Sequence, residues 1–118
     1  MTAHVFSIER ISSVASKARK TLDELGYANV IIRVSDGTLG WQEEAPFAGI
    51  IVTAGAPAIP PIFVEQLEVG GRLVIPVGNE YSQTLLKVVK QDKGYKEKDL
   101  GGVRFVKLIG DHGWKANW

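Results

Sequence analysis

The order of strand-like and helical segments between residues 5 and 77 constrains the fold more than any other feature of this sequence. Runs rich in β-branched and apolar residues predict strands at residues 5–8, 29–34, 47–53 and 72–77. Helices are predicted between them, at residues 11–25 and 62–67. Strands that alternate with helices favour right-handed crossovers and a mostly parallel sheet. The sequence therefore predicts an α/β fold.

The predicted helix at residues 11–25 has one apolar side. Its apolar stripe recurs at helical spacing and consists of Ile11, Val14, Ala15, Ala18, Leu22 and Leu25. The charged residues that fall off this stripe, and are expected to meet water, are Lys17, Lys20, Asp23 and Glu24. Gly26 follows the last apolar position, where a left-handed helix cap costs least in a residue without a Cβ atom. The pattern indicates an amphipathic helix.

The segment at residues 47–53 is a nearly continuous apolar run. Because its residues do not alternate with polar ones, the run predicts a central strand that is covered on both faces. Residues 54–61 follow as a loop or helix entry, since their prolines cannot continue a strand ladder. Pro61 suits the first turn of the short helix predicted after it.

The last third of the chain predicts an antiparallel hairpin. Residues 84–90 and 103–109 are the two candidate strands, and the lysine-rich residues 91–102 are expected to connect them. No helix is predicted between the two strands, so antiparallel pairing is the simplest arrangement. Residues 84–90 also fit a helix, because Leu85 and Val88 suit both periods, but a strand is favoured.

The composition is that of an ordinary globular domain, and it excludes several kinds of site. With 118 residues the chain has the length of one domain, expected to span residues 1–118. The chain has fourteen basic and thirteen acidic residues, and the net charge of +1 gives no indication of a nucleic-acid or membrane-surface partner. The absence of cysteine excludes disulfides and thiolate zinc sites. His4 and His112 lack the spacing of a metal site or catalytic triad.

The sequence carries no recognisable membrane or export signal. No apolar run approaches the roughly 20 residues needed to span a bilayer. Residues 1–6 lack the basic region and the apolar stretch of a signal peptide. We therefore expect a cytoplasmic protein that has no membrane partner.

Several short motifs follow one another in a fixed order along nearly the whole chain. They are Ser7-Ile8-Glu9-Arg10, Asp36-Gly37, Ala45-Pro46-Phe47, Ile50-Ile51-Val52-Thr53-Ala54, Gly70-Gly71-Arg72-Leu73-Val74 and Val103-Arg104-Phe105-Val106. Together they resemble the protein-L-isoaspartate O-methyltransferase family. The resemblance implies a Rossmann-like methyltransferase sheet with a carboxy-terminal antiparallel hairpin. It also implies S-adenosylmethionine as methyl donor and the α-carboxylate of isoaspartyl residues in damaged proteins or peptides as acceptor.

The resemblance also implies site residues on the cofactor side. Glu9 ends a predicted strand, where a carboxylate can accept hydrogen bonds from both ribose hydroxyls. Asp36 is expected to accept from the adenine amino group, while Gly37 lets the backbone approach. Taken without the family, Glu9 also reads as a surface glutamate and Asp36-Gly37 as a plain turn. Thr53, after the apolar strand, is the fourth residue expected to bind the cofactor.

On the substrate side, the resemblance implies small residues and a strand that binds through its backbone. Ala54 leaves room for a ligand at the carboxyl end of the apolar strand. Val103, Arg104, Phe105 and Val106 match the stretch of the family that pairs its main chain with the substrate peptide. The alternative for this stretch is an ordinary strand with an exposed Arg104. The residues that act catalytically are not identified.

The family's glycine-rich turn, which holds the methionine part of the cofactor, is not found in this sequence, since Gly-x-Gly-x-x-Gly does not occur. We therefore expect a truncated sheet whose first strand is missing, weak or absent cofactor binding, and no methyl transfer by this chain alone. Unpaired backbone groups are costly, so we expect the sheet to close the gap or to form a homodimer by strand exchange. The alternative function is a non-catalytic α/β binding or dimerisation module.

Overall fold

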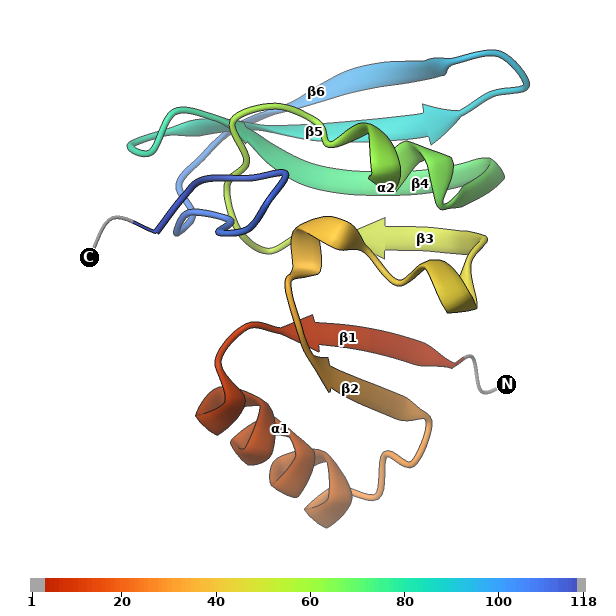
Figure 1. Cartoon of the computed structure of the whole chain (residues 1–118). Helices are drawn as coiled ribbons and strands as arrows, with labels where there is room; N and C mark the ends of the chain where they lie inside the picture. The colour runs from red at the N-terminus through yellow and green to blue at the C-terminus, as the bar shows by residue number, and fades with distance from the viewer. Residues whose placement is uncertain (1–3, 117–118) are drawn as a thin grey trace. The chain divides into compact units, whose positions relative to one another are not determined.

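The protein is represented by a computed structural model that describes residues 4–116. The chain divides into two compact units, residues 1–37 and residues 38–118, and each unit has its own sheet (Figure 1). The first unit contains β1 (Val5–Glu9), α1 (Ser12–Glu24) and β2 (Val30–Val34). The second contains β3 (Phe47–Ile51), α2 (Pro61–Glu65), β4 (Leu67–Gly78), β5 (Gln83–Lys90) and β6 (Tyr95–Val103). Two short 3-10 turns, Gly37–Leu39 and Gln42–Glu44, precede β3.

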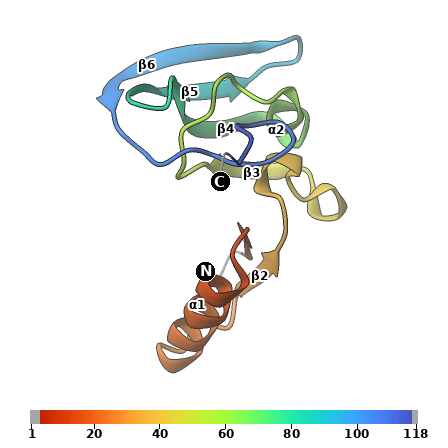
Figure 2. The ribbon, with the colours of Figure 1, turned by 60° about the vertical axis from the view of Figure 1, so that its left-hand side comes forward.

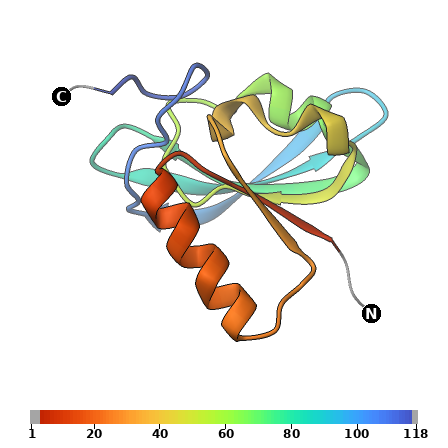
Figure 3. The same cartoon turned by 60° about the horizontal axis from the view of Figure 1, so that its bottom comes forward.

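In the first unit, β1 and β2 form a parallel pair that α1 connects (Figure 3). Their register runs from Val5 opposite Val30 to Glu9 opposite Val34, so both strands end at the same edge. The two predicted strands and the predicted helix are confirmed to within one or two residues.

Helix α1 ends as the sequence predicts. Gly26 has a φ of 81°, and its N–H donates to the Asp23 carbonyl (3.1 Å) while the N–H of Tyr27 donates to the Leu22 carbonyl (2.9 Å). These two bonds form a Schellman cap. Arg19 pairs with Asp23 (2.8 Å) and donates to the carbonyl of Tyr27 (3.3 Å), so it ties the helix to the turn that leads into β2.

The apolar stripe of α1 is covered only in part. Ala15 is buried at 5% exposure, whereas Ile11, Val14 and Leu25 are 44%, 47% and 66% exposed. A pair of strands is narrow, so the residues near the ends of the helix extend beyond the surface that it covers. The charged residues predicted to meet water are all exposed, namely Lys17, Lys20, Asp23 and Glu24.

The sheet of the second unit is mixed, with the strand order β3-β4-β5-β6 (Figure 2). β3 is parallel to β4, and the two later pairs are antiparallel. The prediction of a mostly parallel arrangement is therefore wrong for this unit. The α/β class and the carboxy-terminal antiparallel hairpin are confirmed. The described strands form two separate sheets, so the expected closing of the gap into one sheet is not observed among them.

The prediction that β3 is a central strand covered on both faces is also wrong. β3 lies at the edge of its sheet, with β4 as its one hydrogen-bonded neighbour among the described strands. Ala48 and Gly49 are exposed, and Ile51 is 77% exposed. An apolar run indicates burial only where further strands and layers are available to cover it.

The hairpin has a different second strand from the predicted one. β5 confirms the strand predicted at residues 84–90, but β6 is formed by the lysine-rich residues 95–103 and not by residues 103–109. A tight turn joins the strands, with the N–H of Gln91 donating to the Gly94 carbonyl (3.0 Å). The strand ladder needs only backbone groups, and an edge strand can keep polar side chains in water.

The core of the second unit lies between its sheet and α2. Its buried apolar residues are Ala56, Phe63, Leu67, Leu73, Ile75 and Val88. Pro61 opens α2, as predicted, and Phe63 brings the helix into the core. The Lys90 ammonium group donates to the carbonyls of Glu65 (3.2 Å) and Leu67 (2.8 Å), where the helix ends. Neither helix of the described chain is long and apolar enough to cross a membrane.

Candidate functional site

Glu9 and Asp36 are brought to one edge of the first unit. Glu9 is the last residue of β1 and lies opposite Val34, the last residue of β2. The N–H of Ser35 donates to the backbone carbonyl of Glu9 (3.1 Å), which joins the two strand ends directly. Asp36 is the next residue after Ser35. The carboxyl ends of parallel strands are where open α/β sheets bind ligands, so the location of the two acids is compatible with the predicted cofactor roles, which stay a prediction.

The carboxylate of Glu9 is held in place and retains binding capacity. Its Oε1 accepts a hydrogen bond from the N–H of Ile11 (3.2 Å), at the start of α1. Among the described residues this is the one partner of the carboxylate, and the side chain is half-buried. A carboxylate can accept about four hydrogen bonds. Glu9 therefore fits a ligand that presents hydroxyl groups, such as a ribose.

Gly37 follows Asp36 and lies beside β1. A Cβ atom at Gly37 would be 3.9 Å from the Cγ2 atom of Ile8, which is an ordinary contact. The φ angle of Gly37 is not in the left-handed region either. The fold of the chain therefore does not itself require glycine here, and the expected approach of a ligand stays a prediction.

Thr53 and Ala54 follow β3 in the second unit, and their neighbours connect them to the other predicted stretch. Thr53 is exposed and Ala54 is half-buried. The N–H of Gly55 donates to the Val106 carbonyl (2.6 Å), and the N–H of Leu108 donates to the Gly55 carbonyl (2.8 Å). The residues expected to contact substrate thus come together within this unit, although they lie about fifty positions apart in the sequence.

The stretch from Val103 to Val106 is not the strand that the sequence predicts. Val103 is the last residue of β6, and the chain then crosses the ends of the strands without regular structure (Figure 2). The N–H of Phe105 donates to the Oε1 atom of Gln83 (2.7 Å). Arg104 is exposed, and Val106 is 77% exposed. Part of this backbone is therefore bound internally, and part faces solvent.

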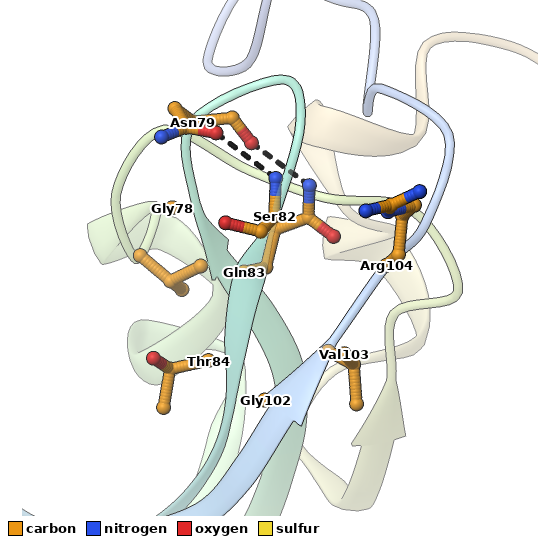
Figure 4. A pocket seen from close by; sticks show the side chains of 9 residues that line it. Gly78, Asn79, Ser82, Gln83, Thr84, Gly102, Val103 and Arg104 are labelled. Atoms are coloured by element: carbon orange, nitrogen blue, oxygen red, sulfur yellow. Dashed lines mark hydrogen bonds between the residues drawn. The ribbon is translucent and has the colours of Figure 1, made fainter.

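An open groove of about 630 Å³ lies where the segment leaves β6 (Figure 4). It is lined by Val77, Gly78, Asn79, Ser82, Gln83, Thr84, Gly102, Val103 and Arg104. Asn79 orders the turn at one end, since its Oδ1 atom accepts from the N–H groups of Tyr81 (2.8 Å) and Ser82 (2.9 Å). Arg104 carries the one ionised side chain in the lining, so the groove favours polar or anionic groups.

The sequence did not single out the buried polar residues that organise this unit. Thr38, Gln66 and Gln83 are between 0% and 5% exposed. Gln66 accepts from the N–H of Trp41 (2.9 Å), and Thr38 accepts from the N–H of His112 (3.0 Å). Their partners are distant in sequence, so local patterns give no signal for them. Within residues 4–116, acidic and histidine side chains do not gather into a group that could hold a metal ion.

Comparison with known proteins decides the family. The sequence profile described as "Protein-L-isoaspartate(D-aspartate) O-methyltransferase (PCMT)" matches residues 1–113. This chain belongs to that family. The protein-L-isoaspartate O-methyltransferase of Desulfosudis oleivorans is 56% identical over 117 residues, which are 99% of this chain and 53% of that protein. The enzyme of the same name from Syntrophus aciditrophicus is 58% identical over 115 residues, 95% of this chain and 53% of that protein.

Solved structures support the same family of methyltransferases. A structure described as a protein-L-isoaspartate O-methyltransferase aligns with a TM-score of 0.84 and 29% identity, over 93% of this chain and 35% of that one. A putative family member from Plasmodium falciparum, in complex with S-adenosyl-L-homocysteine, aligns with a TM-score of 0.77 and 26% identity. The alignment covers 90% of this chain and 52% of that one. The chain thus has the family's fold and spans about half the length of the curated relatives it matches.

Proposed function

We propose that this sequence serves protein repair by methyl transfer from S-adenosylmethionine to the α-carboxylate of isoaspartyl residues. The observation that carries the proposal is the pair of acids at one edge of β1 and β2, in a chain of the isoaspartate methyltransferase family. The bond from Ser35 to the Glu9 carbonyl keeps the two strand ends in register.

On the cofactor side, the proposed role of the chain's residues is to bind and orient S-adenosylmethionine. The cofactor supplies the methyl group when it is bound. Glu9 accepts from the ribose hydroxyls, and its contact with the Ile11 amide fixes the carboxylate at the strand end. Asp36 accepts from the adenine amino group, with Gly37 beside it. A role for Thr53 in cofactor binding stays a prediction from the family resemblance.

On the substrate side, the chain offers a short length of backbone. The backbone of Arg104 has no hydrogen-bonding partner among the described residues, whereas the N–H of Phe105 and the carbonyl of Val106 are bound internally. Main-chain pairing suits a repair enzyme, because it accepts many neighbouring side chains in the substrate. Ala54 and Val103 complete the proposed substrate contacts.

We expect this chain alone to bind S-adenosylmethionine weakly or not at all, and not to transfer a methyl group. Its sequence has no Gly-x-Gly-x-x-Gly turn, whose backbone N–H groups hold the cofactor in folds of this kind. Methyl transfer depends mainly on the alignment of donor and acceptor, so a site without its positioning loop loses most of the rate.

An NMR titration of the chain with S-adenosylhomocysteine tests the cofactor roles. We expect weak shifts at the amides around Glu9 and Asp36, and about tenfold weaker binding in Glu9→Gln and in Asp36→Asn. Glu24→Gln, an exposed change on α1, is the matched control and should bind as the unsubstituted chain does. Absence of shifts at both acids would remove their proposed roles. Saturable micromolar binding would instead contradict the expected weak affinity.

A second candidate function is a non-catalytic dimerisation module. The observation that favours it is the edge strand β3, which has Ile51 at 77% exposure and β4 as its one hydrogen-bonded neighbour among the described strands. We expect light scattering of the chain to give the mass of a dimer if two copies exchange or add strands at this edge. A monomer at high micromolar concentration would exclude this candidate.

A further inference from the structure

We infer that Gln83 is a positioning residue for the substrate: its side chain fixes the backbone around Phe105, so that Arg104 and Val106 are presented to an incoming peptide. The inference rests on the proposed function, because it concerns how the same substrate segment is held. Gln83 was not among the site residues predicted from the sequence, and it is buried, at 5% exposure.

Gln83 stands at the point where three strands end. It is the first residue of β5, and it lies opposite Gly78 at the end of β4 and opposite Val103 at the end of β6. The chain leaves β6 here and crosses toward the loop that follows β3. Figure 4 shows Gln83 between Asn79 and the departing segment at Val103 and Arg104.

Both ends of the Gln83 amide are used. Nε2 donates to the backbone carbonyl of Asn79 (2.8 Å), and Oε1 accepts from the N–H of Phe105 (2.7 Å). The residue is only 5% exposed, so water cannot readily replace either partner. The Asn79 carbonyl can only accept a hydrogen bond, so it requires the Nε2 end of the Gln83 amide and fixes the orientation of that amide. The Oε1 atom then faces the Phe105 N–H and holds it.

Gly55 supports this arrangement from the other side. A Cβ atom there would be 2.8 Å from the Cδ atom of Gln83, so the glycine lies directly against the side chain. The backbone of Gly55 also bonds to the Val106 carbonyl (2.6 Å) and to the Leu108 N–H (2.8 Å). The segment after Arg104 is thus tied at Phe105 by Gln83, and at Val106 and Leu108 by Gly55.

The result is a short backbone that is ordered before any peptide binds. The backbone of Arg104 remains without a partner among the described residues, and the side chain of Val106 is 77% exposed. Addition of an extended peptide to such a backbone requires that its unpaired groups already have the right direction. Ordering them in advance lowers the entropic cost of binding, which is the contribution that we assign to Gln83.

The test uses the full chain and a peptide that contains one isoaspartyl residue, followed by NMR. In the unsubstituted chain we expect peptide-dependent shifts at the amides of Arg104, Phe105 and Val106. Gln83→Met keeps the volume but removes the acceptor, so the Phe105 amide proton should move upfield and peptide affinity should fall about tenfold. The Phe105 shift is a spectroscopic signature that a general loss of stability does not produce.

Gln66→Met is the matched control. Gln66 is also buried, at 2% exposure, and it makes the same kinds of bond, accepting from Trp41 (2.9 Å) and donating to the Leu39 carbonyl (3.3 Å). We expect it to lower stability and leave peptide affinity unchanged. Equal peptide affinity in Gln83→Met and in the unsubstituted chain would overturn the positioning role and leave the proposed function intact. No peptide shifts in the unsubstituted chain would overturn the proposed peptide site, and this inference with it.

Discussion

Replacing Gly55 with alanine tests the packing around Gln83, which holds the segment that follows β6. The added Cβ would lie 2.8 Å from the Cδ atom of Gln83 and 3.0 Å from its Cγ and Nε2 atoms, whereas ordinary van der Waals contact begins at 3.4 Å. The Gln83 side chain must therefore move by about 0.6 Å. It cannot do so freely, because it is held at 2.8 Å by Asn79 and at 2.7 Å by Phe105.

The magnitude follows from these contacts. Overpacking of a buried position costs about 1–3 kcal/mol, and a weakened hydrogen bond adds about 1 kcal/mol. We expect Gly55→Ala to lower the free energy of unfolding by about 2–4 kcal/mol. With a urea dependence of about 2 kcal/mol per molar, the unfolding midpoint should fall by about 1–2 M.

The assay is urea unfolding followed by tryptophan fluorescence. Gly49→Ala is the control, since a Cβ at Gly49 would meet its nearest atom, the Arg72 carbonyl oxygen, at an ordinary 3.6 Å. Its free energy of unfolding should lie within about 0.5 kcal/mol of that of the unsubstituted chain. If Gly55→Ala unfolds at the same urea concentration as Gly49→Ala, then Gln83 is not held as the structure indicates, and the reasoning is refuted.

Two further substitutions test local features of the fold, both by thermal unfolding followed by circular dichroism. Gly26→Ala should lower the free energy of unfolding by about 1–2 kcal/mol, because its φ of 81° is unfavourable for alanine although nothing lies within 4 Å of the added Cβ. Gly102→Ala is the control, since Gly102 is equally open and has no positive φ, and it should change stability little. Equal losses in the two variants would argue against the left-handed cap. Lys90→Met should lower the free energy of unfolding by about 1 kcal/mol, because it removes the hydrogen bonds to the carbonyls of Glu65 and Leu67. Lys87→Met is the control, and an equal loss of stability there would show that these bonds contribute nothing.

The parts of the fold that the sequence predicts correctly are those set by local rules. Helix α1 and its cap at Gly26 follow from apolar spacing and from the conformational freedom of glycine, both of which lie within a few residues. Pro61 marks the first turn of α2 for the same reason. Glu9 and Asp36 lie at the same edge because the two strands, joined by a helix, are parallel and end on the same side.

The errors arise where pairing between strands decides the structure. Residues 103–109 have the apolar content of a strand, yet β6 is built from the polar residues 95–103, because a tight turn at Gly94 brings their backbone beside β5. For the same reason the strand predicted to be central, β3, lies at an edge. Apolar content reports which side chains prefer burial, and it does not report which backbone groups find partners.

The buried glutamines that bind distant backbone groups could not be predicted from local patterns. Gln83 and Phe105 are 22 residues apart, and Gln66 and Trp41 are 25 apart. A glutamine beside an apolar run is common on protein surfaces, so neither one signals burial. Only the fold shows that each satisfies a distant backbone N–H.

The exposed strand β6 determines how the hairpin behaves toward other molecules. Eight of its nine residues are exposed, and its first half carries the alternating charges of Lys96, Glu97, Lys98 and Asp99. A foreign strand that paired here would have to bring its own side chains against this row of ions. Charged edges of this kind oppose the intermolecular β-sheet growth that leads to aggregation. The outer edge of the hairpin is therefore expected to resist unspecific association with other chains.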